Sequence, residues 1–225
     1  DAEELFEQGR LAVDSGLSLA IHAIGDRAVH EVLQAFSQLR DYEAAQQKLD
    51  SERLRHRIEH VQLIHPADQA RLGELGIIAS MQPIHATSDM VMADRFWGQR
   101  AALSYAWRTQ LEHGARLAFG SDAPVESPNP FWGLHAAVTR RREDGSPGAE
   151  GWYPEQRLKL GEALHGFTSG PAYASGMEAR SGRLAPGYLA DLLVLDRDIF
   201  EIDPQAIKET RPTATMVGGA WAWQE

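Results

Sequence analysis

The sequence predicts an α/β protein built on a parallel sheet. Four short apolar runs alternate with helix-like segments through roughly the first 140 residues, and this order is typical of strands joined by crossover helices. The runs are almost continuously apolar, as expected for strands covered on both faces. Three of them end on a residue type that binds metal ions, namely His22, His60 and Asp122. Because the carboxyl ends of parallel strands lie at one edge, we expect these side chains to lie together.

Apolar periodicity and turn residues place the elements of the first half. Asp26 follows Gly25 and is well placed to cap the helix that comes after the first strand. His85 follows Gln82 and Pro83, so we expect it on the loop after the third strand. In chain order the segments are a helix at 2–14, a strand at 17–24, a helix at 26–39, a polar helix or loop at 41–55, a strand at 54–63, a helix at 66–75, a strand at 77–83, an insertion with two helices at 87–113 and a strand from 114 to Asp122.

The second half continues with helices and then changes character. Helices are predicted at 131–142 and 160–173, with a Gly- and Pro-rich loop between them. After residue 180 turn residues predominate, followed by strands at 192–195 and within 213–223, the latter folded back at Gly218-Gly219. We therefore predict a partial α/β barrel domain over 1–180 and part of a small β-sandwich over 181–225.

Composition excludes several classes of protein. The 225 residues carry a net charge of −10, which argues against a nucleic-acid or anionic membrane surface. No apolar run approaches the ~20 residues of a membrane span. The chain has no cysteine, so any metal must be held by His, Asp or Glu. The expected location is cytoplasmic, although the chain begins inside a helix and a targeting segment upstream stays open.

The three strand-end residues are the candidate metal ligands. Neutral imidazoles and a carboxylate suit a divalent cation, whereas the alternative is that each histidine is a hydrogen-bonded core residue. Asp122 is also a candidate general base. His85 is either a substrate contact or a plain loop histidine. Glu59 should point away from His60, toward the covering helices, as a structural ion-pair partner.

Several motifs resemble one known family. The segments are His22-Ala23-Ile24-Gly25-Asp26, Ile58-Glu59-His60, Gln82-Pro83-Ile84-His85, Gly120-Ser121-Asp122-Ala123-Pro124-Val125 and Gly187-Tyr188-Leu189-Ala190-Asp191. In this order they resemble the amidohydrolase superfamily, and within it the branch of YtcJ-type and N-substituted formamide deformylase-like enzymes. The resemblance covers essentially the whole chain.

This resemblance implies the C-terminal half of a metal-dependent hydrolase. The expected fold is strands five to eight of a (β/α)8 TIM barrel plus part of a β-sandwich. By their motifs His22, His60 and Asp122 match metal ligands, Asp122 also matches the general base, and His85 matches a substrate-side residue. The implied cofactor is a divalent metal, with zinc favoured and one or two ions in the intact enzyme. The family's His-x-His pair and its lysine would precede this chain.

The resulting hypothesis is hydrolysis of a non-peptide C–N bond, of the amide or formamide type, in a small molecule. We expect this chain alone to have little or no activity, and its open sheet edges make a homo-oligomer one alternative. Two other functions stay open. One is a non-catalytic metal-binding or interaction module that keeps the fold. The other is a deacetylase or cyclic-amide hydrolase of the same superfamily.

Overall fold

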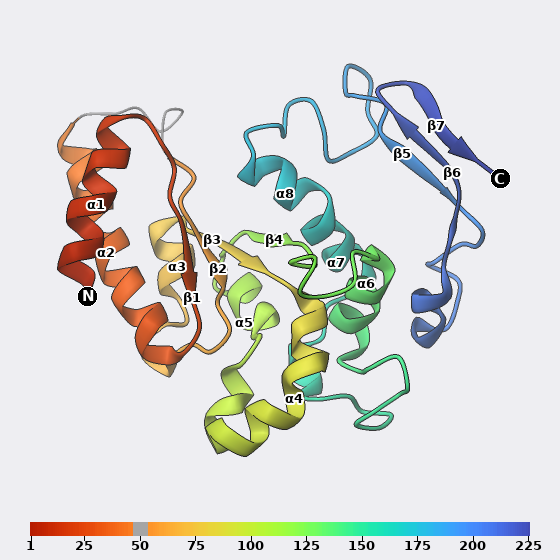
Figure 1. Cartoon of the computed structure of the whole chain (residues 1–225), viewed down its shortest axis with the longest axis horizontal. Coiled ribbons are helices and arrows are strands. Elements are labelled where there is room, and N and C mark those ends of the chain that lie inside the picture. Colours follow the sequence, from red (N-terminus) through yellow and green to blue (C-terminus); the bar gives the residue numbers. More distant parts are fainter. Residues whose placement is uncertain (47–53) are drawn as a thin grey trace. The chain divides into compact units, whose positions relative to one another are not determined.

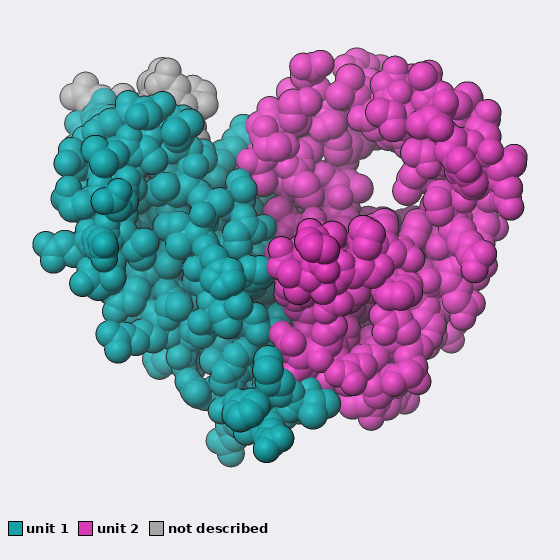
Figure 2. Space-filling view, in the orientation of Figure 1, with its two compact units in different colours: residues 1–81, 91–117 teal, residues 82–90, 118–225 magenta. Residues whose placement is uncertain are grey.

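The computed structural model describes residues 1–46 and 54–225 (Figure 1). These residues form two compact units, which Figure 2 shows in different colours. Unit 1 contains residues 1–81 and 91–117, and unit 2 contains residues 82–90 and 118–225. Residues 47–53 of the predicted polar segment at 41–55 lie outside the described residues. Across the described part of the chain, no helix combines the length and apolar composition needed to cross a membrane.

Unit 1 alternates helices and strands as the sequence predicts. Its elements are α1 (Ala2–Asp14), β1 (Ala20–Ala23), α2 (Asp26–Ala45), β2 (Arg57–His60), η2 (Pro66–Asp68), α3 (Arg71–Leu75), β3 (Ile78–Met81), the later part of α4 (Pro83–Trp97), η3 (Gly98–Leu103), α5 (Trp107–Glu112) and the first residue of β4 (Leu117–Phe119). The sheet has the order β1-β2-β3-β4, and β1/β2 and β2/β3 are parallel. The α/β prediction is confirmed, while the assignment to barrel strands five to eight stays a prediction.

Apolar side chains on one face of α2 form the core of unit 1. Val29, Val32, Leu33, Phe36 and Leu39 recur at helical spacing, and all are buried, so this face is removed from water. α1 packs against α2 at the left of Figure 1. The sheet contributes residues with no exposed surface, among them Ile58 and Ala79. Burial of both groups fixes the strands whose carboxyl ends carry the candidate ligands.

Among the differences between the predicted and observed elements, three lie in segments that contain Pro66, Pro83 or Pro171. The helix predicted at 66–75 is divided into η2 and α3, which begins only at Arg71. The third strand ends at Met81 and α4 starts at Pro83, so His85 lies in a helix and not in a loop. Proline suits a first helical turn because its missing N–H needs no partner there. The helix predicted at 160–173 breaks at Thr168, three residues before Pro171, where a continuous helix would clash with the proline ring.

Unit 2 contains the first part of α4, the end of β4, three further α-helices and a separate sheet. α6 (Pro130–Thr139) begins where the Asn129 side chain accepts a hydrogen bond from the backbone N–H of Phe131. α7 (Leu160–Phe167) packs Gly166 directly on the Phe119 ring at the end of β4. The remaining elements are η4 (Pro154–Gln156), α8 (Ser169–Ala174), β5 (Leu192–Leu195), η5 (Pro204–Glu209), β6 (Pro212–Val217) and β7 (Ala220–Gln224). β5, β6 and β7 form an antiparallel sheet. The predicted domain boundary at residue 180 stays a prediction.

Candidate metal centre

Two of the predicted ligands, His22 and His60, lie side by side in unit 1. Their ring centroids are 4.4 Å apart, with an angle of 72° between the ring planes. His22 is exposed on β1, and His60 is the last residue of β2 and has 9% exposure. The sequence prediction that the ends of these two strands bring both imidazoles together is therefore consistent with the geometry of unit 1.

The backbone of His60 explains how this pair forms. In the sheet register the partner of His22 is Glu59, and Ala23 is the partner of His60. Successive side chains of a regular strand point to opposite faces, so an ideal strand would place His60 away from His22. His60 instead has φ 75°, a left-handed conformation in which the strand ends. Such strained residues cluster at functional sites, and here the strain accompanies the close approach of two imidazoles.

The other two predicted residues, His85 and Asp122, lie together in unit 2. Nε2 of His85 is 3.9 Å from Oδ2 of Asp122, which is too long for a hydrogen bond. Two ligands each about 2.1 Å from a tetrahedral zinc ion lie roughly 3.4 Å apart, so the spacing is close to that of two ligands of one cation. His85 is buried, whereas the Asp122 side chain is 40% exposed.

Local backbone structure holds each member of the second pair. Asp122 has φ 58°, and its carbonyl accepts a hydrogen bond from the N–H of Val125 in a turn directly after β4. His85 occupies the first turn of α4. Arg142 donates from its guanidinium to the carbonyls of Thr87 (2.7 Å) and Ser88 (2.8 Å) in the same helix. The turn and the arginine therefore limit the freedom of the carboxylate and the imidazole.

The donor chemistry fits a divalent metal. Unit 1 offers the imidazoles of His22 and His60, and unit 2 offers the imidazole of His85 and the carboxylate of Asp122. Nitrogen and oxygen donors of this kind suit zinc and similar transition metals. The chain has no cysteine, so any metal must be held by His, Asp or Glu, and these residues are of those types. A divalent metal is thus supported, and the identity of the ion belongs to the proposal below.

The predicted ion-pair role of Glu59 is confirmed by its contact with Arg57, but the predicted direction of its side chain is not. In the register Glu59 lies between His22 on β1 and Ser80 on β3, so it shares their face of the sheet, whereas the fully buried neighbour Ile58 takes the opposite face. Its carboxylate accepts hydrogen bonds from Arg57 Nε (2.5 Å) and from Ser80 Oγ. The strand alternation was predicted correctly, but the positive φ of His60 was not visible in the sequence.

Comparisons with known proteins identify several relatives of this chain. The chain is 34% identical over 221 residues to Protein LONG AFTER FAR-RED 3 of Arabidopsis thaliana, 31% over 227 residues to Putative amidohydrolase YtcJ of Bacillus subtilis (strain 168) and 28% over 211 residues to N-substituted formamide deformylase of Arthrobacter pascens. These alignments cover 97%, 100% and 93% of the chain, but only 36%, 41% and 37% of the relatives. The chain therefore spans about two fifths of the length of these curated relatives.

A solved structure gives the same result. The crystal structure of an uncharacterized metal-dependent hydrolase from Pyrococcus horikoshii OT3 matches with a TM-score of 0.76 and 30% identity, over 91% of this chain and 39% of that one. Strand-end imidazoles and a carboxylate on an α/β fold are the arrangement expected of a metal-dependent hydrolase. The amidohydrolase family model matches residues 2–221, and this chain belongs to that family. The predicted resemblance is confirmed.

Proposed function

We propose that this chain supplies the metal-binding part of an amidohydrolase that cleaves a non-peptide C–N bond of the amide or formamide type. The observation that carries the proposal is the pairing of His22 with His60 and of His85 with Asp122. Family membership supports hydrolysis, and the similarity to an N-substituted formamide deformylase supports the type of bond. The substrate would be a small molecule.

His22, His60 and His85 each have one role in the proposed site, and Asp122 has two. His22, His60 and Asp122 would hold the metal ion. Zinc is our first choice because imidazole and carboxylate donors suit it, and a divalent metal supplies Lewis-acid polarisation of the carbonyl and a lower pKa for water. The Asp122 carboxylate accepts a proton from the attacking water and returns it to the leaving nitrogen as the C–N bond breaks. His85 contacts the substrate from the first turn of α4.

Metal content of the purified chain tests the site. We expect bound zinc, measured by elemental analysis after zinc loading and dialysis, in the wild type and in a His113→Asn control, because His113 is an exposed residue after α5. His60→Asn should lose the metal, since asparagine tolerates the positive φ at this position but offers no imidazole. A wild type without zinc, or a His60→Asn chain that retains it, would contradict the assignment of these ligands.

Activity is tested separately. We propose that this chain alone turns over slowly or not at all, because it spans only about two fifths of the length of its relatives. The assay measures formate released from N-benzylformamide with and without added zinc. Efficient zinc-dependent release by this chain would show that the proposed inactivity is wrong. A longer natural protein that contains this chain should release formate, and its Asp122→Asn variant should not.

A further inference from the structure

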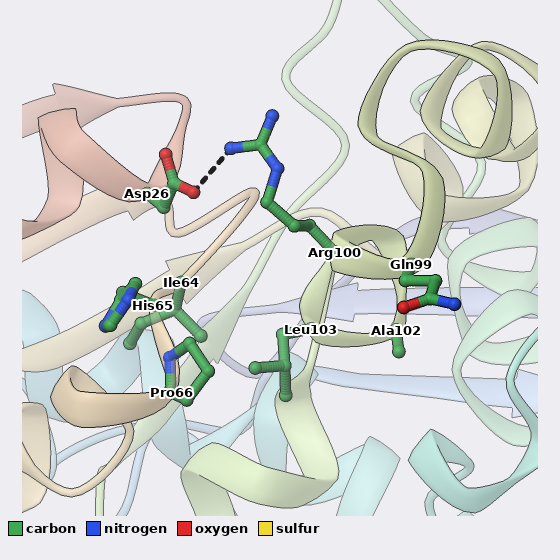
Figure 3. A pocket seen from close by; sticks show the side chains of 8 residues that line it. All are labelled: Asp26, Ile64, His65, Pro66, Gln99, Arg100, Ala102 and Leu103. Atoms are coloured by element: carbon green, nitrogen blue, oxygen red, sulfur yellow. Dashed lines mark hydrogen bonds and ion pairs between the residues drawn. The ribbon is translucent and has the colours of Figure 1, made fainter.

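Unit 1 contains a pocket of about 380 Å³ that has no role in the site described above (Figure 3). Its lining comes from the segment after β1, the segment after β2 and the 3₁₀ helix η3. The residues are Asp26, Ile64, His65, Pro66, Gln99, Arg100, Ala102 and Leu103. The volume lies in the range of small-molecule sites. Because β1 and β2 are the strands that carry His22 and His60, the pocket follows them at the same end of the sheet.

Backbone hydrogen bonds build the walls of this pocket. The N–H of Ile64 donates to the carbonyl of Leu103 (3.3 Å), and the N–H of Tyr105 donates to the carbonyl of Gln62 (3.0 Å). Leu63 and Ser104 form an antiparallel bridge between the same segments. The end of η3 is therefore fixed against the segment after β2. A pocket whose walls are already bonded to one another binds a ligand with a small ordering cost.

An ion pair between Asp26 and Arg100 joins two walls of the pocket. Nη1 of Arg100 is 2.6 Å from Oδ2 of Asp26, and Figure 3 shows the two side chains meeting on one side, with Ile64, Pro66 and Leu103 on the other. Asp26 is not the N-cap of α2 that the sequence predicted, because Gly25 occupies that position. Its side chain therefore belongs to the pocket, and its only backbone partner in the described contacts is the adjacent N–H of Arg27.

The charges of Asp26 and Arg100 oppose each other in the pocket, which is also lined by the imidazole of His65. Burial raises the pKa of the Asp26 carboxyl, but hydrogen bonds from Arg100 and the Arg27 backbone, together with the Arg100 charge, hold its pKa below the ordinary value. Asp26 is consequently ionised at neutral pH and balances Arg100. A carboxylate or an ammonium group placed in the pocket would find its opposite charge already paired, so its desolvation would not be compensated. The other walls offer the apolar side chains of Ile64, Pro66, Ala102 and Leu103.

We propose that this pocket is a subsite for an uncharged apolar group of the substrate, of the size of a phenyl or branched alkyl group. The inference rests on the proposed function only in calling the ligand a substrate. The built walls, the apolar lining and the internal charge balance are properties of unit 1 itself. The Asp26–Arg100 pair sets the selectivity for neutral groups, because loss of either charge exposes the other to the ligand.

Binding of three probes to the 225-residue chain tests the proposal without relying on catalysis. The probes are N-benzylformamide (neutral), phenylacetate (anionic) and benzylamine (cationic), titrated by NMR or calorimetry. We expect N-benzylformamide to bind at least about tenfold more tightly than either charged probe. Ala102→Trp fills the pocket and should weaken the neutral probe about tenfold or more. Ala44→Trp, on an exposed turn of α2, is the matched control and should bind like the wild type.

Two further variants test the charge balance without filling the pocket. Arg100→Gln leaves Asp26 uncompensated and should shift binding toward benzylamine, whereas Asp26→Asn leaves Arg100 uncompensated and should shift it toward phenylacetate. An unchanged order of probes in both variants, or equal binding by Ala102→Trp and the wild type, would overturn the subsite. The probes also separate this proposal from the metal site. A His60→Asn chain that loses zinc but still binds N-benzylformamide would support the subsite. A wild type that binds zinc but none of the three probes would refute the subsite and leave the metal site standing.

Discussion

The two ends of the sheet in unit 1 both carry histidines, but they use them differently. At the amino end His56 has no exposed surface, and both ring nitrogens are engaged. Nδ1 accepts a hydrogen bond from the N–H of Leu19 (3.0 Å), and Nε2 lies 3.0 Å from Oε1 of Glu43. At the carboxyl end His22 is exposed and lies against the ring of His60. Burial and hydrogen-bonded ring nitrogens, and not the residue type, therefore separate a structural histidine from a candidate ligand.

The amino end is also a closed electrostatic network. Arg40 donates to Glu43 at 2.6 Å and to the carbonyl of Leu75 at 3.0 Å, and Phe36 stacks on His56 with ring centroids 5.2 Å apart. A buried group in such a network is costly to remove because its partners lose their hydrogen bonds without regaining water. Substitutions at the two ends should therefore affect different properties of the chain.

The largest expected effect on stability is at His56. His56→Ala leaves the Glu43 carboxylate and the Leu19 N–H without their buried partner, so we expect a loss of about 2–4 kcal/mol in the free energy of unfolding. Urea denaturation measures this, and zinc binding by the folded fraction should be unchanged. If His56→Ala lost zinc while keeping its stability, the contrast between the two ends would be wrong.

A smaller effect is expected where α7 packs on β4, three residues before Asp122. A Cβ at Gly166 would lie 2.5 Å from the ring of Phe119, whereas a Cβ at Gly161 in the same helix would meet nothing within 4 Å. Gly166→Ala should therefore cost about 1–3 kcal/mol, while Gly161→Ala should be neutral or stabilising by up to about 1 kcal/mol. Thermal unfolding of both variants compares them, and equal midpoints would contradict the packing.

The pH dependence of stability sharpens the comparison further. Burial raises the pKa of Glu43, but hydrogen bonds from His56 and Arg40 and the charge of Arg40 lower it more, so its pKa lies below the ordinary value. A carboxyl group with a depressed folded-state pKa stabilises the fold above its unfolded-state pKa of about 4.3, and this stabilisation is lost as the pH falls through the folded-state value. Urea midpoints between about pH 6 and pH 3 should fall less steeply in Glu43→Gln than in the wild type. Equal slopes would exclude this carboxyl group as a source of acid sensitivity.

The smallest effect on stability is expected at Arg142, which holds the helix of His85 through two carbonyls. Arg142→Ala should cost about 1 kcal/mol or less, because the side chain is partly exposed. Hydrogen exchange at the start of α4 should nevertheless become faster, since two of its carbonyl contacts are lost. Lys208→Ala, which removes a contact from a half-buried lysine to the Glu143 carbonyl, is the matched control and should leave α4 unchanged. The same exchange rates in Arg142→Ala and the wild type would contradict the positioning role.

The α/β class, the alternation of strands and helices along the chain and the residues near the carboxyl ends of the strands could be predicted from the sequence. Continuous apolar runs and helical periodicity are local patterns, and they directly specify which segments are buried. The residue types His22, His60, His85 and Asp122, with the absence of cysteine, also restricted the chemistry to imidazole and carboxylate donors. The motifs around them led to the family that the comparisons confirm.

Four features of the site and the pocket depend on tertiary structure and could not be predicted from local sequence patterns. The positive φ of His60 turns it toward His22, and the parallel register places Glu59 beside both His22 and Ser80. Pro83 starts a helix under His85 instead of a loop. Asp26 does not cap α2 but accepts a hydrogen bond from Arg100, a residue 74 positions away in the chain. Each of these outcomes depends on a backbone angle or on a partner that is distant in sequence. The conformation of lowest free energy for a residue depends on its neighbours in the folded chain, and the local sequence does not specify them.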